Sequence, residues 1–348
     1  MEGSKVRAAL IGFGSIGKRH ARCLAQKFEE LAIVDVDPLA REAAKTQFPK
    51  AHVLSSLAEL WRFDWPWQEV LVVIATWGPS HYELFCECAG RGVGRILCEK
   101  PLAGSLLEGW RMVVEAKERG ITLGVNHTLR FLGVDRGLKT LAQQYSLGPV
   151  HSVVVHGGAS GLVTNGIHFI DLAMSVIGAS PASVVSTAAG EAINPRSPGL
   201  LFFGGSAVWT FPAGEEAVLS LHNRSSIYPT ATLYYRDGAI YLHDRTMAVV
   251  LGRSGGPLPP HLPVTRTAPA GERLYQGPVP GVLGSMEEAF LRHYDEVAAG
   301  RLESFSPEDA YRALEACLGA LIAAQRGERI RFPIDPQSEW GRRRWPIS

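Results

Sequence analysis

The chain has 348 residues, of which 46% are hydrophobic and 20% are charged. This length favours two domains over one, and the composition is that of a folded globular protein rather than a disordered one. The formal net charge is +1, from 35 basic and 34 acidic residues, so no overall field attracts the protein to nucleic acid or to a membrane surface. We therefore expect neither partner.

We recognise no targeting signal, and the cysteine pattern also favours a protein of the cytoplasm. The apolar run at residues 6–11 is too short for a signal peptide, and no apolar run reaches the roughly 18 residues that a membrane span needs. The five cysteines include no Cys-x-x-Cys pair, which indicates reduced thiols in a reducing compartment. The basic stretch Arg342–Arg344 is expected to be a solvated tail.

The first part of the chain alternates apolar runs of strand length with helical stretches. The runs are almost continuously apolar, as are strands buried on both faces of a parallel sheet. Asp37 and Pro38 suit the N-cap and the first residue of a helix. We predict a doubly wound α/β domain over residues 1–125. Its expected strands are 6–12, 31–37, 70–76, 95–100 and 121–126, and its expected helices are 15–27, 38–47, 79–90 and 104–119.

The rhythm changes after Asn126, and residues 126–348 are predicted to form an α+β domain. Strands that follow one another without helices between them indicate a mainly antiparallel sheet, and Asp237-Gly238 marks a hairpin. Residues 252–284 are rich in Gly and Pro and are expected to form an irregular arm. The other expected elements are helices at 134–146 and 165–177, strands at 150–156, 184–191, 205–211 and 216–222, and two closing helices introduced by Ser285–Glu288 and Ser306-Pro307.

A glycine-rich turn near the start predicts a dinucleotide site. Gly12-Phe13-Gly14-Ser15-Ile16-Gly17 fits G-x-G-x-x-G, follows a buried strand, opens a helix and is followed by Asp35 at the end of the next strand. Gly12 permits the tight turn, Gly14 lets the backbone approach a pyrophosphate, and Gly17 lets helix and strand pack closely. The helix N-terminus then attracts the phosphates.

Asp35 favours NAD over NADP. Its carboxylate accepts hydrogen bonds from a ribose diol and repels a 2′-phosphate. Asp37 is a competitor for this role but is better placed as an N-cap. Lys18 and Arg19 lie close enough in the sequence to keep NADP as the less favoured alternative.

Glu99-Lys100-Pro101 ends one of the predicted strands. Ligands of doubly wound sheets lie beyond the carboxyl ends of the strands, so Lys100 is expected beside the nicotinamide. A lysine that acts as a base needs a pKa below its ordinary value of about 10.4, which burial or a nearby cation provides. The alternative is a surface lysine paired with Glu99.

The order of these motifs resembles the glucose–fructose oxidoreductase/inositol dehydrogenase (Gfo/Idh/MocA) family. G-x-G-x-x-G-x-x-H at Gly12–His20 is followed by Ala75-Thr76 with His81, by Glu99-Lys100-Pro101, and by G-x-H-x-x-D at Gly166–Asp171. The resemblance implies a Rossmann domain, an open-faced C-terminal sheet, a homodimer or homotetramer, and NAD(P)-linked hydride transfer at a secondary hydroxyl or keto carbon of a sugar, sugar acid or nucleotide-linked sugar. It implies Lys100 and His168 as acid and base, and Thr76, Trp77, His81 and Glu99 beside the cofactor.

One further element concerns the substrate. His127-Thr-Leu-Arg130-Phe131 is similar to the H-x-x-R-F element of relatives that oxidise nucleotide-linked sugar acids. This likeness implies that His127 and Arg130 bind a carboxylate or a phosphate, which arginine contacts through two parallel hydrogen bonds. A structural ion pair is the alternative role of Arg130.

The sequence departs from the family pattern at two places. Trp77-Gly78 stand where the family has Pro-Asn, so the indole either packs on the cofactor or fills space. Thr164 stands where the family has Asp, and a threonine accepts no proton at neutral pH. Thr164, Asn165 and Asp171 are candidate substrate-binding residues, but Thr164 or Asn165 is equally a candidate N-cap. Asp171 either orients the His168 imidazole or faces solvent.

Two other functions stay open. One is a non-catalytic sensor that keeps the fold to bind a dinucleotide or sugar, which the missing Asp suggests. The other is a glycoside hydrolase that retains and recycles NAD, which the family resemblance also permits. Metal catalysis is not expected, because the sequence has no HExxH motif or cysteine cluster.

Overall fold

A computed structural model describes residues 6–193, 199–259, 261–262 and 271–348. Contacts group the chain into two compact units. Unit 1 comprises residues 1–131, 285–314 and 336–348, and unit 2 comprises residues 132–284 and 315–335. The boundary predicted after residue 125 stays a prediction. None of the described helices is long and apolar enough to cross a membrane.

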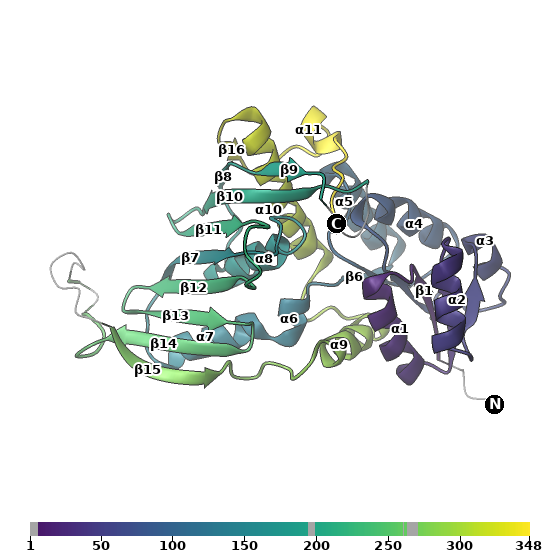
Figure 1. The fold of residues 1–348 in the computed structure, drawn as a ribbon, viewed down its shortest axis with the longest axis horizontal. Helices are drawn as coiled ribbons and strands as arrows, with labels where there is room; N and C mark the ends of the chain where they lie inside the picture. The colour runs from purple at the N-terminus through teal and green to yellow at the C-terminus, as the bar shows by residue number, and fades with distance from the viewer. Residues whose placement is uncertain (1–5, 194–198, 260, 263–270) are drawn as a thin grey trace. The chain divides into compact units, whose positions relative to one another are not determined.

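Unit 1 is built on a six-stranded parallel sheet with the order β3-β2-β1-β4-β5-β6 (Figure 1). This order reverses direction at β1, so the predicted doubly wound α/β fold is confirmed. Its central strands are completely buried, which explains their continuous apolar sequences. The strands are β1 (Arg7–Ile11), β2 (Glu30–Val34), β3 (His52–Leu54), β4 (Leu71–Ile74), β5 (Arg95–Cys98) and β6 (Thr122–Val125). Strand β3 was not predicted, because three partly exposed residues carry no apolar run.

The helices of unit 1 include a segment from the far end of the chain. Helix α9 (Met286–Ala298) packs on α1 and on β4, β5 and β6, and its Phe290 and Tyr294 join the core beneath α1. Ser285 caps α9 by accepting a hydrogen bond from the Glu288 amide at 3.1 Å, as predicted. The other helices are α1 (Ser15–Lys27), α2 (Pro38–Gln47), α3 (Leu57–Leu60), α4 (Gly78–Gly90), α5 (Leu106–Arg119), α6 (Thr128–Leu132) and α11 (Glu339–Arg342), while α10 (Pro307–Arg326) passes from unit 1 into unit 2.

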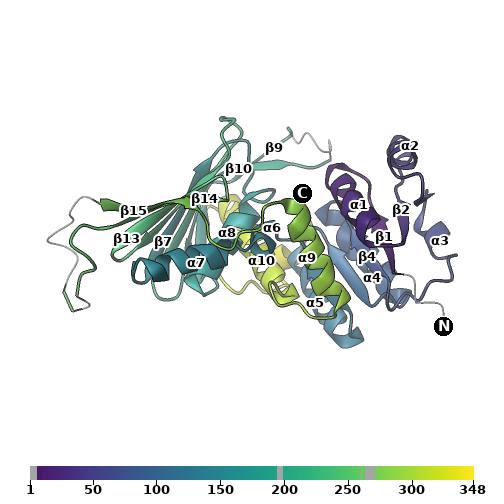
Figure 2. The same ribbon diagram turned by 90° about the horizontal axis from the view of Figure 1, so that it is seen from below.

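Unit 2 contains a mixed and mostly antiparallel sheet, as predicted. Its order is β15-β14-β13-β12-β7-β11-β10-β8-β16, with β9 paired to β10. Among the described strands of this unit, only β7 and β11 pair in parallel. Helices α7 (Val134–Gln144) and α8 (Gly166–Ile177) cover one face (Figure 2). The strands are β7 (Val150–Gly157), β8 (Ser183–Ser186), β9 (Ala189–Glu191), β10 (Phe202–Thr210), β11 (Glu216–Leu221), β12 (Thr230–Tyr235), β13 (Gly238–His243), β14 (Met247–Arg253), β15 (Gly271–Pro278) and β16 (Ile330–Arg331).

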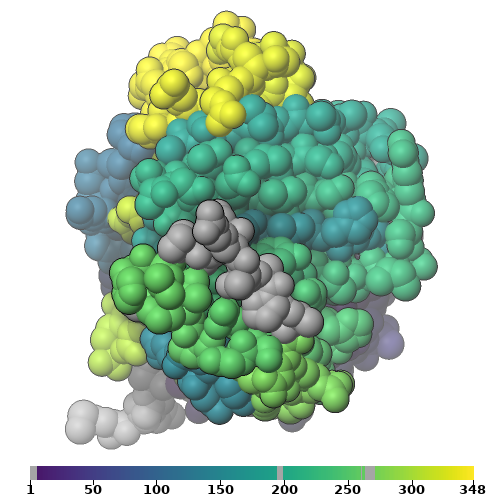
Figure 3. Space-filling view, turned by 90° about the vertical axis from the view of Figure 1, so that its left-hand side faces the viewer, coloured from purple at the N-terminus to yellow at the C-terminus, as the bar shows by residue number. Residues whose placement is uncertain are grey.

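Buried and exposed residues alternate along the strands of unit 2. Ala231, Leu233 and Tyr235 of β12 are buried, whereas Thr230 and Tyr234 are exposed. This period of two belongs to a sheet with one covered face and one open face. Figure 3 shows unit 2 from the ends of its strands, where chain coloured teal to green forms the surface.

Two predictions about irregular segments were wrong. The supposed arm at 252–284 contains β15, which pairs with β14 and places its Gly and Pro at the strand ends, where an edge strand tolerates them. Residues 260 and 263–270 of that arm lie outside the described residues. The basic stretch at Arg342–Arg344 is not a solvated tail, because Arg344 pairs with Glu83 and Glu108. The following Trp345 and Ile347 are buried.

Candidate active site

The glycine turn between β1 and α1 has the geometry of a dinucleotide site. Gly12 has a φ of +97°, and a Cβ there would lie 2.9 Å from the carbonyl oxygen of Ala75. A Cβ on Gly17 would lie 2.1 Å from the carbonyl oxygen of Gly12, so helix and strand touch with no room for a side chain. Gly14 has open space where its Cβ would be. Gly12 thus permits the tight turn, Gly17 the close packing of helix and strand, and Gly14 the approach of a ligand.

The beginning of α1 is prepared for an anion. Gly14 is the N-cap, and no side chain caps the helix. The first turn, which starts with Ser15 and Ile16, contains no acidic residue that would compete with a phosphate. The free amides and the positive end of the helix dipole therefore suit the pyrophosphate of a dinucleotide.

Asp35 follows β2 directly and is fixed by the backbone. Its Oδ2 accepts a hydrogen bond from the Phe13 amide at 2.6 Å, and its Oδ1 accepts one from the Asp37 amide at 2.8 Å. Each carboxylate oxygen has a second acceptor position. The two backbone hydrogen bonds therefore fix the orientation of the side chain and leave it able to accept hydrogen bonds from a ribose diol. Asp37 caps α2 by accepting from the Leu39 amide at 2.9 Å, as predicted.

The cations near Asp35 are arranged differently from the sequence expectation. Lys18 Nζ lies 5.8 Å from the centre of the Phe13 ring, and Arg19 points to Met286 of α9. Arg41, which sequence reasoning missed, donates from Nη1 to the carbonyl oxygens of Asp35 and Val36 at 3.0 and 2.9 Å. An arginine in this place is the residue type that accommodates a 2′-phosphate in NADP enzymes. Its only sequence signal was its short spacing from Asp35.

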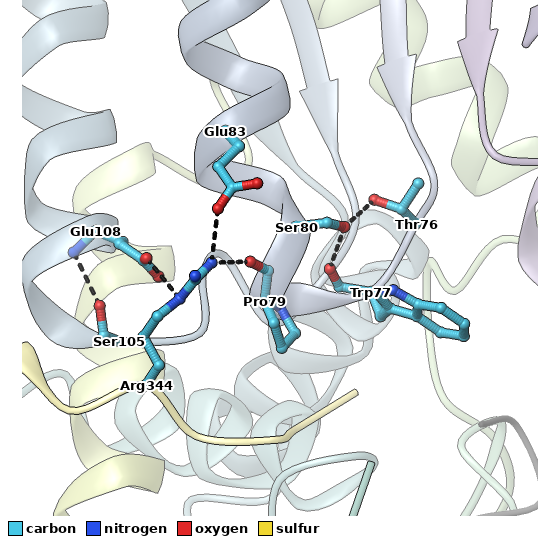
Figure 4. Close-up of polar contacts among 8 residues, drawn as sticks. All are labelled: Thr76, Trp77, Pro79, Ser80, Glu83, Ser105, Glu108 and Arg344. Carbon is cyan, nitrogen blue, oxygen red and sulfur yellow. Dashed lines mark hydrogen bonds and ion pairs between the residues drawn. The ribbon is translucent and has the colours of Figure 1, made fainter. Parts of the chain in front are cut away.

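The turn after β4 presents an aromatic ring to solvent. The Ser80 hydroxyl contacts Thr76 Oγ1 and the Trp77 carbonyl oxygen, both at 2.8 Å, and this closes the turn into α4 (Figure 4). The Trp77 indole extends away from these polar contacts and is 45% exposed. A stacking contact of this ring with a ligand stays a prediction.

His81 anchors the turn that carries Lys100. Its side chain is fully buried, and its Nδ1 lies 2.9 Å from the Pro101 carbonyl oxygen, so Nδ1 carries the proton and donates. Burial lowers the pKa of His81, which keeps the ring neutral. The contact that the structure shows for His81 is thus with the Lys100-Pro101 turn.

Glu99 is a buried carboxylate directly before Lys100, at the carboxyl end of β5. Its Oε1 accepts from His20 Nε2 at 2.8 Å and from Asn126 Nδ2 at 2.6 Å. Burial alone would raise the pKa of Glu99, but the hydrogen bonds from His20 and Asn126 and the charge of Lys100 outweigh it and lower that pKa. Glu99 is therefore ionised, and it directly precedes the half-buried Lys100.

A chain of hydrogen bonds extends from Glu99 to α9. His20 Nδ1 lies 2.6 Å from the Tyr294 hydroxyl, and the His20 ring stacks on Phe290 with 4.4 Å between ring centres. Burial raises the pKa of Tyr294, so its phenol stays protonated and donates. With Nε2 donating to Glu99 and Nδ1 accepting from Tyr294, a neutral His20 is satisfied. His20 belongs to a predicted motif in which it had no expected role, and the roles of Asn126 and Tyr294 were not predicted.

The H-x-x-R-F segment packs on aromatic rings of unit 1. The fully buried His127 ring lies 4.4 Å from that of Phe305, and the Arg130 guanidinium lies 5.3 Å from the same ring. Phe131 stacks on His293 with 3.6 Å between ring centres. A substrate-binding role of His127 and Arg130 stays a prediction.

The remaining predicted residues lie at the start of α8 in unit 2. Asn165 occupies the N-cap position, but its side chain forms no capping hydrogen bond, and Thr164 and His168 are half-buried. Asp171 is only 1% exposed, so the alternative in which it faces solvent was wrong. It lies one helical turn after His168, on the same face of α8. Among the described residues, no three His, Cys, Asp or Glu side chains are placed to share a metal ion.

Residues 6–127 match the model of an oxidoreductase family with an NAD-binding Rossmann fold, Gfo/Idh/MocA. Over these residues the chain resembles this family. The glycine turn, Asp35 and the Glu99-Lys100-Pro101 strand end all fall within the matched residues.

Relatives and solved structures extend the likeness along the chain. Inositol 2-dehydrogenase 2 of Paenarthrobacter aurescens is 29% identical over 56% of this chain, which spans 62% of that relative. An inositol 2-dehydrogenase of Rhizobium meliloti is 24% identical over 86% of this chain and 87% of its own length. The structure of a levoglucosan dehydrogenase with NADH superposes with a TM-score of 0.74, 18% identity and coverage of 95% of this chain and 100% of that one. The solved structure establishes a shared fold.

Proposed function

We propose that the protein is an NAD-dependent dehydrogenase that oxidises a secondary hydroxyl group of a cyclic polyol or sugar. The observation that carries this proposal is the buried link between the two halves of the Rossmann site. Glu99, which precedes Lys100, is bonded to His20 of the helix that begins at the glycine turn. The positions of the reactive lysine and of the coenzyme turn are therefore set by one network.

The residues of the glycine turn and Asp35 suit NAD better than NADP. The amides at the start of α1 bind the phosphates, and the fixed Asp35 carboxylate accepts the ribose hydroxyl groups. Arg41 supports the alternative, because a guanidinium beside Asp35 would attract a 2′-phosphate. We place Asp35 first because its carboxylate is hydrogen-bonded to the Phe13 amide of the glycine turn itself. Bound NAD supplies the acceptor for the hydride.

Lys100 and His168 are proposed to manage the hydroxyl proton. Lys100 is proposed to donate a hydrogen bond to the substrate oxygen and to stabilise negative charge on it. A neutral imidazole is the better proton acceptor near pH 7, so His168 is the proposed base. Asp171, one turn further along α8, is proposed to orient His168 in place of the family Asp that Thr164 replaces.

The substrate class rests on the relatives. Inositol dehydrogenases and a levoglucosan dehydrogenase are among the similar proteins, and both names denote ring compounds with secondary hydroxyl groups. A nucleotide-linked sugar acid is the second choice. The ring contacts of His127 and Arg130 with Phe305 give a structural role to the residues that suggested it.

The open face of the sheet in unit 2 is proposed to join copies of this chain. Tyr234, Tyr241 and Met247 of neighbouring strands all point to this face and are 38%, 40% and 38% exposed. Adjacent exposed apolar side chains of this kind mark interaction surfaces. Light scattering of the wild type and of Tyr241→Arg tests this, with a dimer or tetramer expected only for the wild type. The proposed compartment is the cytoplasm, since all five cysteines are free.

The test of the proposed function is reduction of NAD and of NADP by a panel of inositols, aldoses and nucleotide-linked sugar acids. We expect an inositol or a related cyclic sugar to give the highest kcat/KM, with NAD preferred. Tight NAD binding without turnover of any substrate would favour the sensor. Release of free sugar from a glycoside without net formation of NADH would favour the hydrolase, which retains and recycles its NAD.

A further inference from the structure

The C-terminal strap, residues 336–348, is packed into unit 1. Its helix α11 contacts α5, and the Trp345 amide donates to the Gly104 carbonyl oxygen at 2.8 Å. Trp345 and Ile347 are 3% and 0% exposed. The Arg343 guanidinium covers the rings of Trp340 and Trp345 at 5.2 and 4.6 Å. The strap is thus held on both sides of Arg344, which limits where that side chain can reach.

Arg344 joins the starts of α4 and α5, as Figure 4 shows. Its Nη2 donates to the Pro79 carbonyl oxygen and lies 3.3 Å from Glu83 Oε1, both in α4. Its Nε lies 2.9 Å from Glu108 Oε1 in α5. Burial raises the pKa of Glu108 and the charge of Arg344 opposes that rise, so the guanidinium favours the ionised carboxylate. Only a planar guanidinium presents donors in these separate directions at once.

The part of α4 that Arg344 holds lies directly against the Lys100 turn. A Cβ on Gly78 would lie 2.8 Å from Pro101 Cγ, and a Cβ on Gly104 would lie 3.0 Å from Pro79 Cα. No side chain fits between the two segments at these points. The hydrogen bond from His81 Nδ1 to the Pro101 carbonyl oxygen, at 2.9 Å, joins them again. A displacement of Pro79 is therefore passed to Pro101 and to its neighbour Lys100.

We propose that Arg344 is a positioning residue that holds the turn Thr76–Ser80, and through it Lys100, in the place the reaction needs. The ion pair with Glu83 contributes little to stability, because the two side chains are 48% and 71% exposed. Glu108 is only 13% exposed, and the carbonyl oxygen of Pro79 is fixed in the helix backbone. The effect of Arg344 is thus on the geometry of the two turns rather than on the folding of unit 1.

The test compares Arg344→Gln with Arg342→Gln. Both changes remove one positive charge from the strap, but Arg342 donates from Nη2 to Gln337 Oε1 at 3.2 Å, a contact within the strap itself. Hydrogen–deuterium exchange of peptides covering 76–81 and 99–104 is measured together with kcat, KM and the melting temperature. We expect faster exchange in these two peptides for Arg344→Gln alone, with unchanged exchange at β1 and β2. We also expect kcat to fall about tenfold with a smaller change in KM, and Arg344→Lys to recover part of it.

The exchange measurement separates this proposal from the proposed function on which its kinetic part rests. If the wild type oxidises no polyol or sugar, the proposed function fails, and the exchange of the two peptides still decides the role of Arg344. Unchanged exchange in both peptides overturns the proposal. So does an increase spread evenly over unit 1 with a lower melting temperature and an unchanged kcat, since that is the result of a purely structural residue.

Discussion

His20 Nε2 lies 2.8 Å from Glu99 Oε1, and this buried contact joins the coenzyme helix to the strand end that carries Lys100. His20 comes from α1, whose first turn is the proposed phosphate site, and Glu99 immediately precedes Lys100. Both side chains are buried and the carboxylate is ionised, so a substitution of either residue should affect both the glycine turn and Lys100.

The Tyr294 hydroxyl is predicted to stabilise the fold through His20. Tyr294→Phe removes the donor 2.6 Å from His20 Nδ1 and leaves a buried nitrogen without its partner. We expect the free energy of unfolding to fall by about 1–3 kcal/mol in a denaturant titration. Tyr275→Phe is the control, because it removes a hydrogen bond of the same length, to the Pro278 carbonyl oxygen, that is exposed to solvent. Equal stability of Tyr294→Phe and wild type would contradict the hydrogen-bond chain.

Stability is predicted to fall below the ordinary pKa of histidine. Burial lowers the pKa of His81 and, more strongly, of His293. Below about pH 6.5 these histidines bind protons in the unfolded chain but stay neutral in the folded chain. Their full contribution to stability is therefore present above this pH and is lost as the pH falls. Each histidine contributes a slope of at most about 1.4 kcal/mol per pH unit.

His293→Leu tests this dependence. Neither ring nitrogen of His293 has a hydrogen-bond partner among the described residues, so the loss of the imidazole removes the titration without breaking a hydrogen bond. Denaturant unfolding from pH 7.5 down to about 5 is expected to give a shallower slope for this variant. The exposed His243→Gln is expected to keep the wild-type slope. An unchanged slope for His293→Leu would show that this ring is charged in the folded protein.

Two glycines of the turn are predicted to separate folding from coenzyme binding. The new Cβ of Gly14→Ala has no atom within 4 Å, so we expect wild-type stability. We also expect a loss of NAD affinity, because the methyl group would occupy the proposed pyrophosphate position. Gly17→Ala would bring a Cβ to 2.1 Å from the Gly12 carbonyl oxygen and should lower both stability and affinity. Calorimetry of NAD binding and thermal unfolding measure the two effects. Undiminished NAD binding by Gly14→Ala would place the phosphates elsewhere.

Asp35 is predicted to set the preference between the two coenzymes. Asp35→Ser removes a charged acceptor of the ribose diol and should weaken NAD binding by about 10–100-fold, the effect of losing a charge-assisted hydrogen bond. NADP binding should weaken less or improve, since Arg41 remains beside the site. Asp37→Asn keeps an N-cap for α2 and is the matched control. If the binding of NAD and of NADP weakens equally, the role of Asp35 is only to support the turn through the Phe13 amide.

Much of unit 1 was predictable because its signals are local. The boundaries of α1 and α2 were predicted to the residue, since a glycine turn begins one and Asp37-Pro38 begins the other. The apolar strands followed from their burial on both faces. Strand β15 escaped prediction because Leu274 and Tyr275 lie between glycines and a proline at the sheet edge. An edge strand needs no long apolar run.

The candidate site was predictable only in part, because its supporting contacts are distant in sequence. Tyr294 reaches His20 across 274 positions, and Arg344 reaches Pro79 across 265. No spacing pattern connects such pairs. The basic composition around Arg344 suggested a solvated tail, whereas the buried Trp345 beside it fixes the strap on α5. Local motifs therefore located the glycine turn and Lys100, but not the residues that position them.

The most direct test of the central claim is the turnover of Lys100→Ala and its NADH affinity, measured in the same preparation with the best substrate of the panel. We expect a loss of kcat of about 10²–10⁴-fold, with an NADH dissociation constant within a few-fold of the wild type. Turnover equal to the wild type would show that Lys100 takes no part in the reaction.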